Sequence, residues 1–345
     1  MMALVTSSIT TYTYSLSRLL QLLLLLNSQI VLYGLTKPLN IRRNVVSVSR
    51  SINQTVKIKN LGIIIPAYNE ENRILQTLGS YQDYFLNYRA LPEFLDANTN
   101  IKIIIVDDGS SDNTVAKIRR FREISKATEE TIGKQTHFNI DYLSLDKNRG
   151  KGAAIARGVQ ELQQIQKDTK DSYILITDAD ASADIQTSFE KLRPLMRKSN
   201  SSPPDLIIGN RLSTSKNTSL LRLILRYGFR AFVRVCGGLG GVKDTQCGFK
   251  FISQDLAHVL YTNLHLMRWT HDVEVCFLAS KLNVTIENVD VNWEEKEGSK
   301  LVDKSVTLDL VLVIIGMIVD ILIMRFMYFF RRWNIPEYDN AKKRK

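Results

Sequence analysis

The stretch YILITDAD, residues 173–180, decides the fold of this chain. Its first five residues, Tyr173 to Thr177, form a mainly apolar run with the length of a strand that is buried on both faces. Asp178 and Asp180 follow at the point where that strand ends. An isolated Asp-x-Asp is typical of an ordinary turn, but ligands of open α/β sheets bind at the carboxyl ends of strands. The position of this pair therefore predicts a ligand site at a sheet edge.

Apolar runs of the same kind recur on both sides of this stretch, and segments with helical spacing separate them. Strands that alternate with helices predict an α/β, Rossmann-like fold with a mostly parallel sheet and helices on both faces. The expected strands are 61–65, 102–106, 141–145, 173–177 and 205–209, and two clear expected helices are 113–123 and 152–166.

Acidic side chains also follow two other expected strands. PAYNEE, residues 66–71, comes after the first strand, and DDGSSD, residues 107–112, comes after the second. In a doubly wound sheet these groups and residues 178–180 converge at one edge, where the carboxylates repel one another unless a cation is bound. Oxygen-only ligands favour Mg²⁺ or Mn²⁺, which we expect on Asp178 and Asp180.

A glycine-containing loop, NRGKGAA at residues 148–154, leads into the expected helix at 152–166. Its two glycines allow the backbone to approach a ligand, and Arg149 and Lys151 bring positive charge near a helix N-terminus, which suits a diphosphate. The spacing is neither that of a Walker loop nor Gly-x-Gly-x-x-Gly. This argues against P-loop and dinucleotide enzymes.

The net charge of +11 is carried by the flanks of the chain. Residues 36–60 are basic and contain no acid, the tail 331–345 is also basic, and bases and acids balance over residues 61–330. A nucleic-acid-binding domain is expected to carry a basic face, so we expect no nucleic-acid partner. The terminal KKRK, residues 342–345, resembles a dilysine retrieval signal of endoplasmic-reticulum membrane proteins and also suits adhesion to anionic lipid.

Two apolar segments lie in these flanks. Residues 19–35 predict a signal anchor, and the bases that follow place its C-terminal side in the cytosol by the positive-inside rule. Residues 306–330 are longer but include Asp309, Asp320 and Arg325. Because the two aspartates return to nearly the same helical face, an in-plane or protein-packed helix is favoured over a second transmembrane span.

The order of PAYNE, VDDGS, NRGKG and DAD along the chain resembles glycosyltransferase family 2, whose fold is called GT-A, over roughly residues 60–305. Later segments look like the dolichyl-phosphate β-glucosyltransferases within that family. These segments are DTQCGFK at 244–250, WTHDVE at 269–274, VNW at 291–293 and GSK at 298–300.

This resemblance implies an inverting enzyme that moves glucose from UDP-glucose to dolichyl phosphate and forms dolichyl β-D-glucosyl phosphate for protein N-glycosylation. It implies a single-pass protein of the endoplasmic reticulum membrane with its catalytic domain in the cytosol; a homo-oligomer stays open. The chain then divides into a short N-terminal tail (1–18), the signal anchor (19–35), a basic linker (36–60), the GT-A domain (61–305), a membrane-associated or packing helix (306–330) and a basic tail (331–345).

Residue roles follow as hypotheses. Asp272, with Asp180, is expected to be catalytic, as a general base or an orienting group, and its alternatives are a helix N-cap role and replacement by Glu274. The expected nucleotide-sugar ligands are Pro66, Tyr68, Glu70, Asp107, Asp108, Lys151 and Asp178, and the expected metal ligands are Asp178 and Asp180. The expected acceptor-phosphate ligands are Arg211, Lys300, and Arg226 and Arg230 from a basic ridge at four-residue spacing, which a solvated helix face would also explain.

Two alternatives remain at this point. Departures from the family at Ala181-Ser182, Asn210 and His271 leave the sugar open, so a dolichyl-phosphate mannosyltransferase that uses GDP-mannose is one alternative. The other is a catalytically dead protein that binds a nucleotide sugar or a lipid. Its expected signature, the loss of a carboxylate from a strand end, is absent from the sequence.

Overall fold

The computed structural model describes residues 54–86, 91–95, 98–132, 138–198, 203–213, 220–294 and 308–339. The expected signal anchor, most of the basic linker, Lys300 and the terminal KKRK lie outside the described residues.

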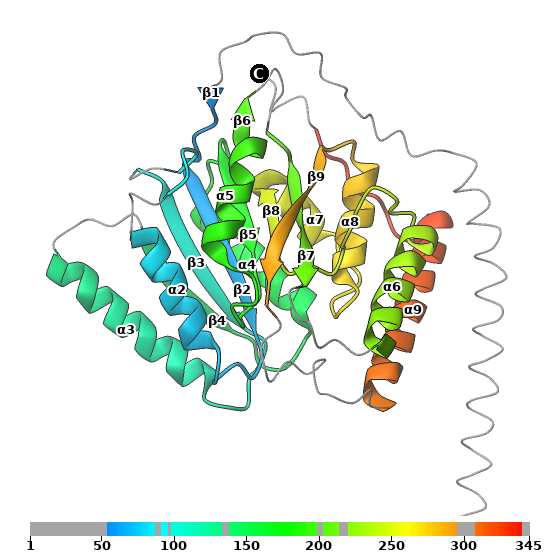
Figure 1. Ribbon diagram of the computed structural model, residues 1–345, viewed down its shortest axis with the longest axis horizontal. Helices are drawn as coiled ribbons and strands as arrows, with labels where there is room; N and C mark the ends of the chain where they lie inside the picture. Colours follow the sequence, from blue (N-terminus) through cyan, green and yellow to red (C-terminus); the bar gives the residue numbers. More distant parts are fainter. Residues whose placement is uncertain are drawn as a thin grey trace, which may run out of the picture.

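A seven-stranded sheet in the order β4-β3-β2-β5-β8-β7-β9 forms the centre of the molecule (Figure 1). Every neighbouring pair in this sheet is parallel except those that involve β8, which runs antiparallel to β5 and β7. The strands are β2 (Asn60–Ala67), β3 (Asn100–Asp107), β4 (Phe138–Ser144), β5 (Ser172–Ile176), β7 (Leu206–Ser213), β8 (Lys250–Ser253) and β9 (Ile286–Trp293). A separate pair joins β1 (Gln54–Thr55) to β6 (Arg197–Lys198).

All five strands expected from apolar runs are present, although their ends shift by a few residues. The run expected at 141–145 is the second half of β4, which begins at Phe138 because Phe138 and Ile140 alternate into the core. The apolar runs did not predict β8, because this strand has only four residues and begins with a lysine. Its pairing partners are also far away in the sequence.

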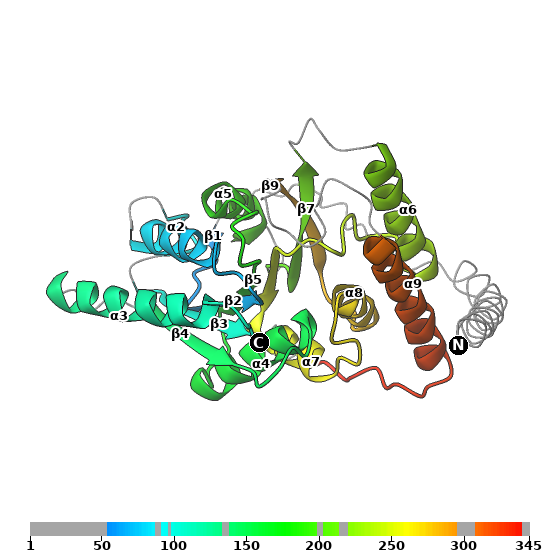
Figure 2. The same ribbon diagram turned by 90° about the horizontal axis from the view of Figure 1, so that it is seen from below.

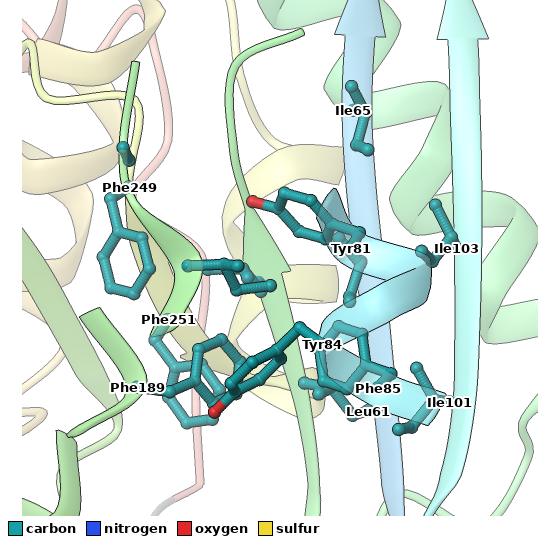
Figure 3. Close-up of a cluster of buried hydrophobic side chains, with 14 of the residues drawn as sticks. Leu61, Ile65, Tyr81, Tyr84, Phe85, Ile101, Ile103, Phe189, Phe249 and Phe251 are labelled. Atoms are coloured by element: carbon teal, nitrogen blue, oxygen red, sulfur yellow. The ribbon is translucent and has the colours of Figure 1, made fainter. Parts of the chain in front are cut away.

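Helices cover both faces of the sheet, as expected from the sequence. Alternate residues of one strand serve the two faces: Ile63 and Ile65 of β2 join one core, and Ile64 joins the other. The first core includes the aromatic side chains Tyr81, Phe85, Phe189 and Phe251 (Figure 3). The helices are α2 (Ile74–Leu86), α3 (Thr114–Ile132), α4 (Lys151–Ile165), α5 (Ile185–Met196), α6 (Leu220–Cys236), α7 (Gln254–Thr262), α8 (His271–Lys281) and α9 (Leu308–Phe329).

The carboxyl ends of three parallel strands lie side by side. β2 lies between β3 and β5, with Ala67 opposite Asp107 in one pair and Ile64 opposite Ile176 in the other. The chain winds outward in both directions from β2, so the crevice beyond its end is the topological switch point where α/β sheets bind ligands.

At one end of the molecule, α9 lies beside α6 and α8 (Figure 2). Within the described chain it is the one helix long and apolar enough to cross a membrane by length and composition, over Leu312–Phe329. Most of that stretch is not buried against the protein, and Leu312 and Phe329 are among its exposed apolar side chains. The Asp320 carboxylate instead faces the protein, where it accepts a hydrogen bond from the Thr270 hydroxyl.

Candidate active site

The loops after β2 and β3 are tied together by short hydrogen bonds. Asn69 has a left-handed backbone (φ 56°), which lets its amide donate to Ser110 Oγ at 2.9 Å while its side-chain oxygen accepts from the Ser111 amide at 2.9 Å. The Glu70 amide donates to Thr114 Oγ1 at 2.7 Å. The two acidic loops predicted to converge therefore form one rigid rim at the switch point, with Pro66 and Tyr68 half-buried in it.

Glu70 carries a strongly perturbed carboxyl group. Burial raises its pKa to about 7, against the opposing effect of Arg73, whose Nε donates to Glu70 Oε2 at 2.7 Å. The negative charges of Asp180 and Asp178 raise this pKa further, which indicates that the three carboxyl groups share one electrostatic environment. A cation bound among the three carboxyl groups would offset this repulsion and favour the ionised form of Glu70.

Asp107, the last residue of β3, and Asp108, which follows it, are both buried and have different partners. The Asp107 carboxylate accepts from the Ser110 amide at 3.2 Å. The Asp108 carboxylate accepts from the amides of Arg149 and Gly150, at 2.7 and 2.9 Å. Burial raises the pKa of Asp108, and these two amides oppose that shift. Asp108 thus holds the glycine-containing loop in place, a contact that the nucleotide-binding hypothesis for this residue did not include.

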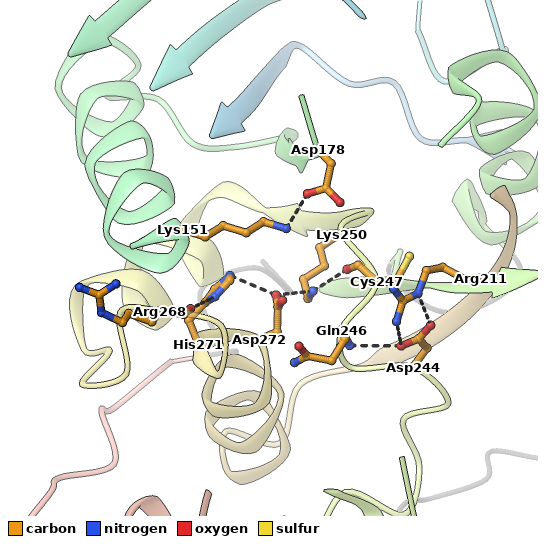
Figure 4. A network of polar contacts seen from close by, with 10 residues as sticks. All are labelled: Lys151, Asp178, Arg211, Asp244, Gln246, Cys247, Lys250, Arg268, His271 and Asp272. Carbon is orange, nitrogen blue, oxygen red and sulfur yellow. Dashed lines mark hydrogen bonds and ion pairs between the residues drawn. The ribbon is translucent and has the colours of Figure 1, made fainter. Parts of the chain in front are cut away.

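Lys151, at the start of α4, points to the end of β5. Its ammonium group lies 2.5 Å from Asp178 Oδ1 (Figure 4). Burial alone would lower the pKa of Lys151, but the charges of Asp178 and Asp272 outweigh this and raise it above its ordinary value. The structure thus brings the glycine-containing loop, which is expected to bind the diphosphate, into contact with the Asp-x-Asp.

The residues at the end of β5 fit a divalent cation. Gly248 lies so close to Asp178 that an added Cβ would be 2.2 Å from the Asp178 carboxylate, so only a glycine fits there. Asp180 accepts from the Ser182 amide at 3.0 Å through one oxygen. Among the described residues no three acidic, histidine or cysteine side chains cluster as a complete metal site. A pair of carboxylates completed by phosphate oxygens and water is the usual way in which proteins hold Mg²⁺ with a nucleotide.

Asp272 lies near the Lys151–Asp178 pair, at the start of α8, and is almost fully buried. Its Oδ1 accepts from Lys250 Nζ at 2.5 Å and lies 3.2 Å from His271 Nε2 (Figure 4). Burial alone would raise the pKa of Asp272, but His271 and Lys250 outweigh it and hold the pKa far below its usual range. Asp272 is therefore a permanent negative charge, and its carboxylate is bound to side chains rather than serving as the N-cap of α8.

Glu274, the alternative to Asp272, is committed elsewhere. It is fully buried, and its carboxylate accepts from the amides of His265 and Leu266 and from Tyr328 Oη, at 2.9, 2.6 and 2.7 Å. A carboxylate with this many donors and no exposed surface is a structural brace.

Two of the four expected acceptor-phosphate ligands share an acidic partner. Arg211 makes a bidentate ion pair with Asp244, at 2.7 and 3.0 Å, and Arg230 donates to the same carboxylate. These contacts hold the pKa of Asp244 low against its burial. Arg211 and Arg230 keep about a quarter of their side-chain surface exposed. The side chain of Arg226, like Lys300, lies outside the described residues, so the basic ridge stays a prediction.

The same arrangement of segments is found in known proteins. The model of the family described as glycosyl transferase family 2 matches residues 62–260. The chain belongs to glycosyltransferase family 2. It is 36% identical to a dolichyl-phosphate β-glucosyltransferase of Dictyostelium discoideum over 80% of this chain and 76% of that protein. It is 34% identical to the enzyme of the same name from Mus musculus, over 71% of this chain and 70% of that one.

Among solved structures, glucosyl-3-phosphoglycerate synthase from Mycobacterium tuberculosis in complex with phosphoglyceric acid is similar in fold. The TM-score is 0.50 at 14% identity, and the match covers 82% of each chain. Membership of glycosyltransferase family 2 and this likeness confirm the GT-A fold expected from the sequence, and the chain is a glycosyltransferase.

Sequence reasoning missed two residues of the site in this family 2 enzyme. Lys250 is 1% exposed and neutralises Asp272, and Asp244 binds two arginines. Both lie in the stretch DTQCGFK, residues 244–250, which the resemblance had singled out without giving them roles. The signal for Lys250 was a lysine that opens an apolar run, because such a lysine is buried only when a carboxylate neutralises it.

Proposed function

We propose that this glycosyltransferase is a dolichyl-phosphate β-glucosyltransferase that uses UDP-glucose. The match to proteins of that name over 80% of the chain carries the assignment, and the family match at residues 62–260 covers the strand ends that form the site. The geometry supports the chemistry, because a rim of carboxylates, a buried ammonium group and a buried aspartate meet at one sheet edge.

The donor half of the site lies at the ends of β2, β3 and β5. Pro66, Tyr68, Glu70 and Asp107 form the rim for uridine and ribose, and Asp108 holds the loop that carries Lys151. Asp178 and Asp180 would hold Mg²⁺ or Mn²⁺ against the diphosphate, where the cation neutralises charge as UDP leaves. Lys151, already beside Asp178, adds positive charge at the same place.

The acceptor needs little help to become a nucleophile. A phosphate monoester has a second pKa of about 6, so dolichyl phosphate is largely a dianion at neutral pH. One of its oxygens attacks the anomeric carbon, the bond from that carbon to the UDP oxygen breaks, and no proton has to be removed. In-line displacement inverts the α-linked donor to a β-linked product. Asp272, whose pKa is held low by His271 and Lys250, then orients the acceptor or the sugar instead of accepting a proton.

The membrane assignment belongs to the same proposal. The expected anchor at residues 19–35, the exposed apolar side chains of α9 and the basic flanks support an endoplasmic reticulum membrane protein with its catalytic domain in the cytosol. In this arrangement dolichyl phosphate reaches the site from the bilayer, and UDP-glucose reaches it from the cytosol.

The test compares two aspartates of the same segment. Asp180→Asn removes a proposed metal ligand, whereas Asp184→Asn removes the same charge from the N-cap of α5, where asparagine caps equally well. Full-length protein in detergent is given UDP-[³H]glucose, dolichyl phosphate and Mn²⁺, and lipid-extractable label is counted. We expect Asp180→Asn to reduce turnover on the order of 10²- to 10³-fold and Asp184→Asn to leave it nearly unchanged.

No lipid-linked glucose from the wild-type protein would contradict the proposed function and favour the catalytically dead alternative. Equal turnover in both variants would contradict the metal role of Asp180 alone.

A further inference from the structure

The apolar helix α9 is joined to the segment that carries Asp272 by two side-chain hydrogen bonds, one buried and one half-buried. Thr270 is fully buried, and its hydroxyl donates to Asp320 Oδ2 of α9 at 2.6 Å. Farther along both segments, about two turns along α9 and one turn into α8, Tyr328 Oη donates to Glu274 Oε1 at 2.7 Å. A half-buried carboxylate on a mostly apolar helix costs desolvation that an apolar residue would not, so this contact points to a requirement for position.

The use of Thr270 is unusual for its place in the fold. Thr270 precedes His271 and Asp272 and occupies the N-cap position of α8, where a threonine hydroxyl ordinarily accepts from an amide of the first turn. Here its side chain makes no such bond. The Thr270 hydroxyl donates to α9 instead, and the Thr270 backbone carbonyl accepts hydrogen bonds from the amides of Val273 and Glu274.

Glu274 fixes the other end of the same loop, residues 264–270. Its carboxylate holds the amides of His265 and Leu266 while it accepts from Tyr328. The 264–270 loop is thus held at both ends by groups that α9 contacts directly.

This loop also touches the donor side of the site. The Met267 carbonyl accepts from the Ala153 amide at 3.3 Å, and a Cβ at Gly150 would be 2.4 Å from the same oxygen. A Cβ at Gly152 would be 2.6 Å from Cβ of His271. A displacement of the loop therefore moves both Asp272 and the glycine turn that presents Lys151.

We propose that α9 is a positioning element for glycosyl transfer: Asp320 and Tyr328 fix the 264–270 loop and thereby set Asp272 against the phosphate loop at residues 148–154. Neither residue reaches the reacting atoms in this account. The inference rests on the proposed function, since its main readout is the rate of that transfer.

The first test removes the hydroxyl of Thr270 without changing its shape. Thr270→Val is expected to lower kcat about 10- to 100-fold, the effect of a catalytic group displaced by a fraction of an ångström to an ångström. Thr270→Ser keeps the hydroxyl and is expected to recover most of the wild-type rate. Rates are expressed per UDP-binding site, measured by calorimetry with Mn²⁺, so that loss of folded protein does not count as loss of catalysis.

The second test removes the partner on α9. Asp320→Ala is expected to lower kcat as Thr270→Val does, Asp320→Asn keeps an acceptor oxygen and restores most of the rate, and the double variant is no slower than either single one. Ile315→Ala, a change on an exposed part of the same helix, is the matched control and should turn over like the wild type.

Unchanged turnover per UDP-binding site in Thr270→Val and Asp320→Ala would overturn the proposal, even if both melt at a lower temperature. Effects that multiply in the double variant would overturn it as well. Each variant's rate is divided by the wild-type rate with the same donor, whichever donor the wild type uses. Failure of UDP-glucose as a donor would therefore contradict the proposed function, but the variants could still be compared with another donor. If the wild type transfers no sugar, the test is hydrogen–deuterium exchange at the backbone amides of His265 and Leu266. The proposal expects faster exchange in Thr270→Val and Asp320→Ala than in the wild type, and unchanged exchange would contradict it.

Discussion

Single residues of the site are defined by the charges around them. Asp272 is a buried and Glu70 a half-buried carboxyl group, yet their pKa values move in opposite directions. Asp272 has His271 and Lys250 within reach, whereas Glu70 has one arginine and two neighbouring aspartates. The first is therefore a permanent anion, and the second is poised to lose its proton near neutral pH when a cation enters.

Glu70 should give the protein a distinct pH dependence. Its pKa is about 7 in the folded protein and about 4.5 in the unfolded chain, so the folded state binds more protons between these values. The free energy of unfolding then falls as pH rises from about 4.5 to about 7, by roughly 3 kcal/mol from this group. Relative to the wild type, Glu70→Gln should gain stability across this range and level off above it, as measured by chemical unfolding in EDTA. A difference between the two proteins that does not vary with pH would contradict this assignment.

At the scale of elements, Asp244 joins β7 to α6. Arg211 comes from β7, Arg230 from α6, and Asp244 from the segment that leads to β8. In this cluster one buried carboxylate faces two partly exposed guanidinium groups, so removal of the carboxylate leaves two cations beside each other.

We expect Asp244→Asn to lower the free energy of unfolding by about 3 kcal/mol, because both arginines lose their charged partner and are only partly hydrated. Asp290→Asn is the matched control: Asp290 is an exposed partner of Asn210 on the neighbouring strand β9, and its loss should cost about 0.5 kcal/mol or less. Thermal or urea unfolding of the two variants measures the difference. If instead Asp244→Asn kept its stability and bound dolichyl phosphate more tightly, the arginines would be acceptor ligands that Asp244 merely restrains.

At the scale of the whole molecule, the sequence predicted the parts of the site that depend on local order. Buried parallel strands end in line, so the meeting of residues 66–71, 107–112 and 178–180 followed from the strand pattern alone. The contact of Lys151 with Asp178 was not predicted, although both residues were expected at this edge of the sheet.

The partners of Asp272 and Arg211 could not be predicted in this way. Lys250 reaches Asp272 from β8, whose antiparallel position between β5 and β7 no local periodicity indicates. Asp244 meets Arg211 across a separation of 33 residues that only the assembled sheet closes. Similarly, Asp320 favoured an in-plane or protein-packed helix in the sequence, but only the packing of α9 identifies its partner, Thr270.

The central claim is that this site selects UDP-glucose for transfer to dolichyl phosphate. The most direct measurement is kcat/KM of the purified full-length protein for UDP-glucose and for GDP-mannose, each with dolichyl phosphate and the same divalent cation. The account predicts that UDP-glucose is preferred by at least about 100-fold, since a buried polar site rejects a donor that leaves its groups unpaired. Equal use of the two donors, or a preference for GDP-mannose, would contradict it.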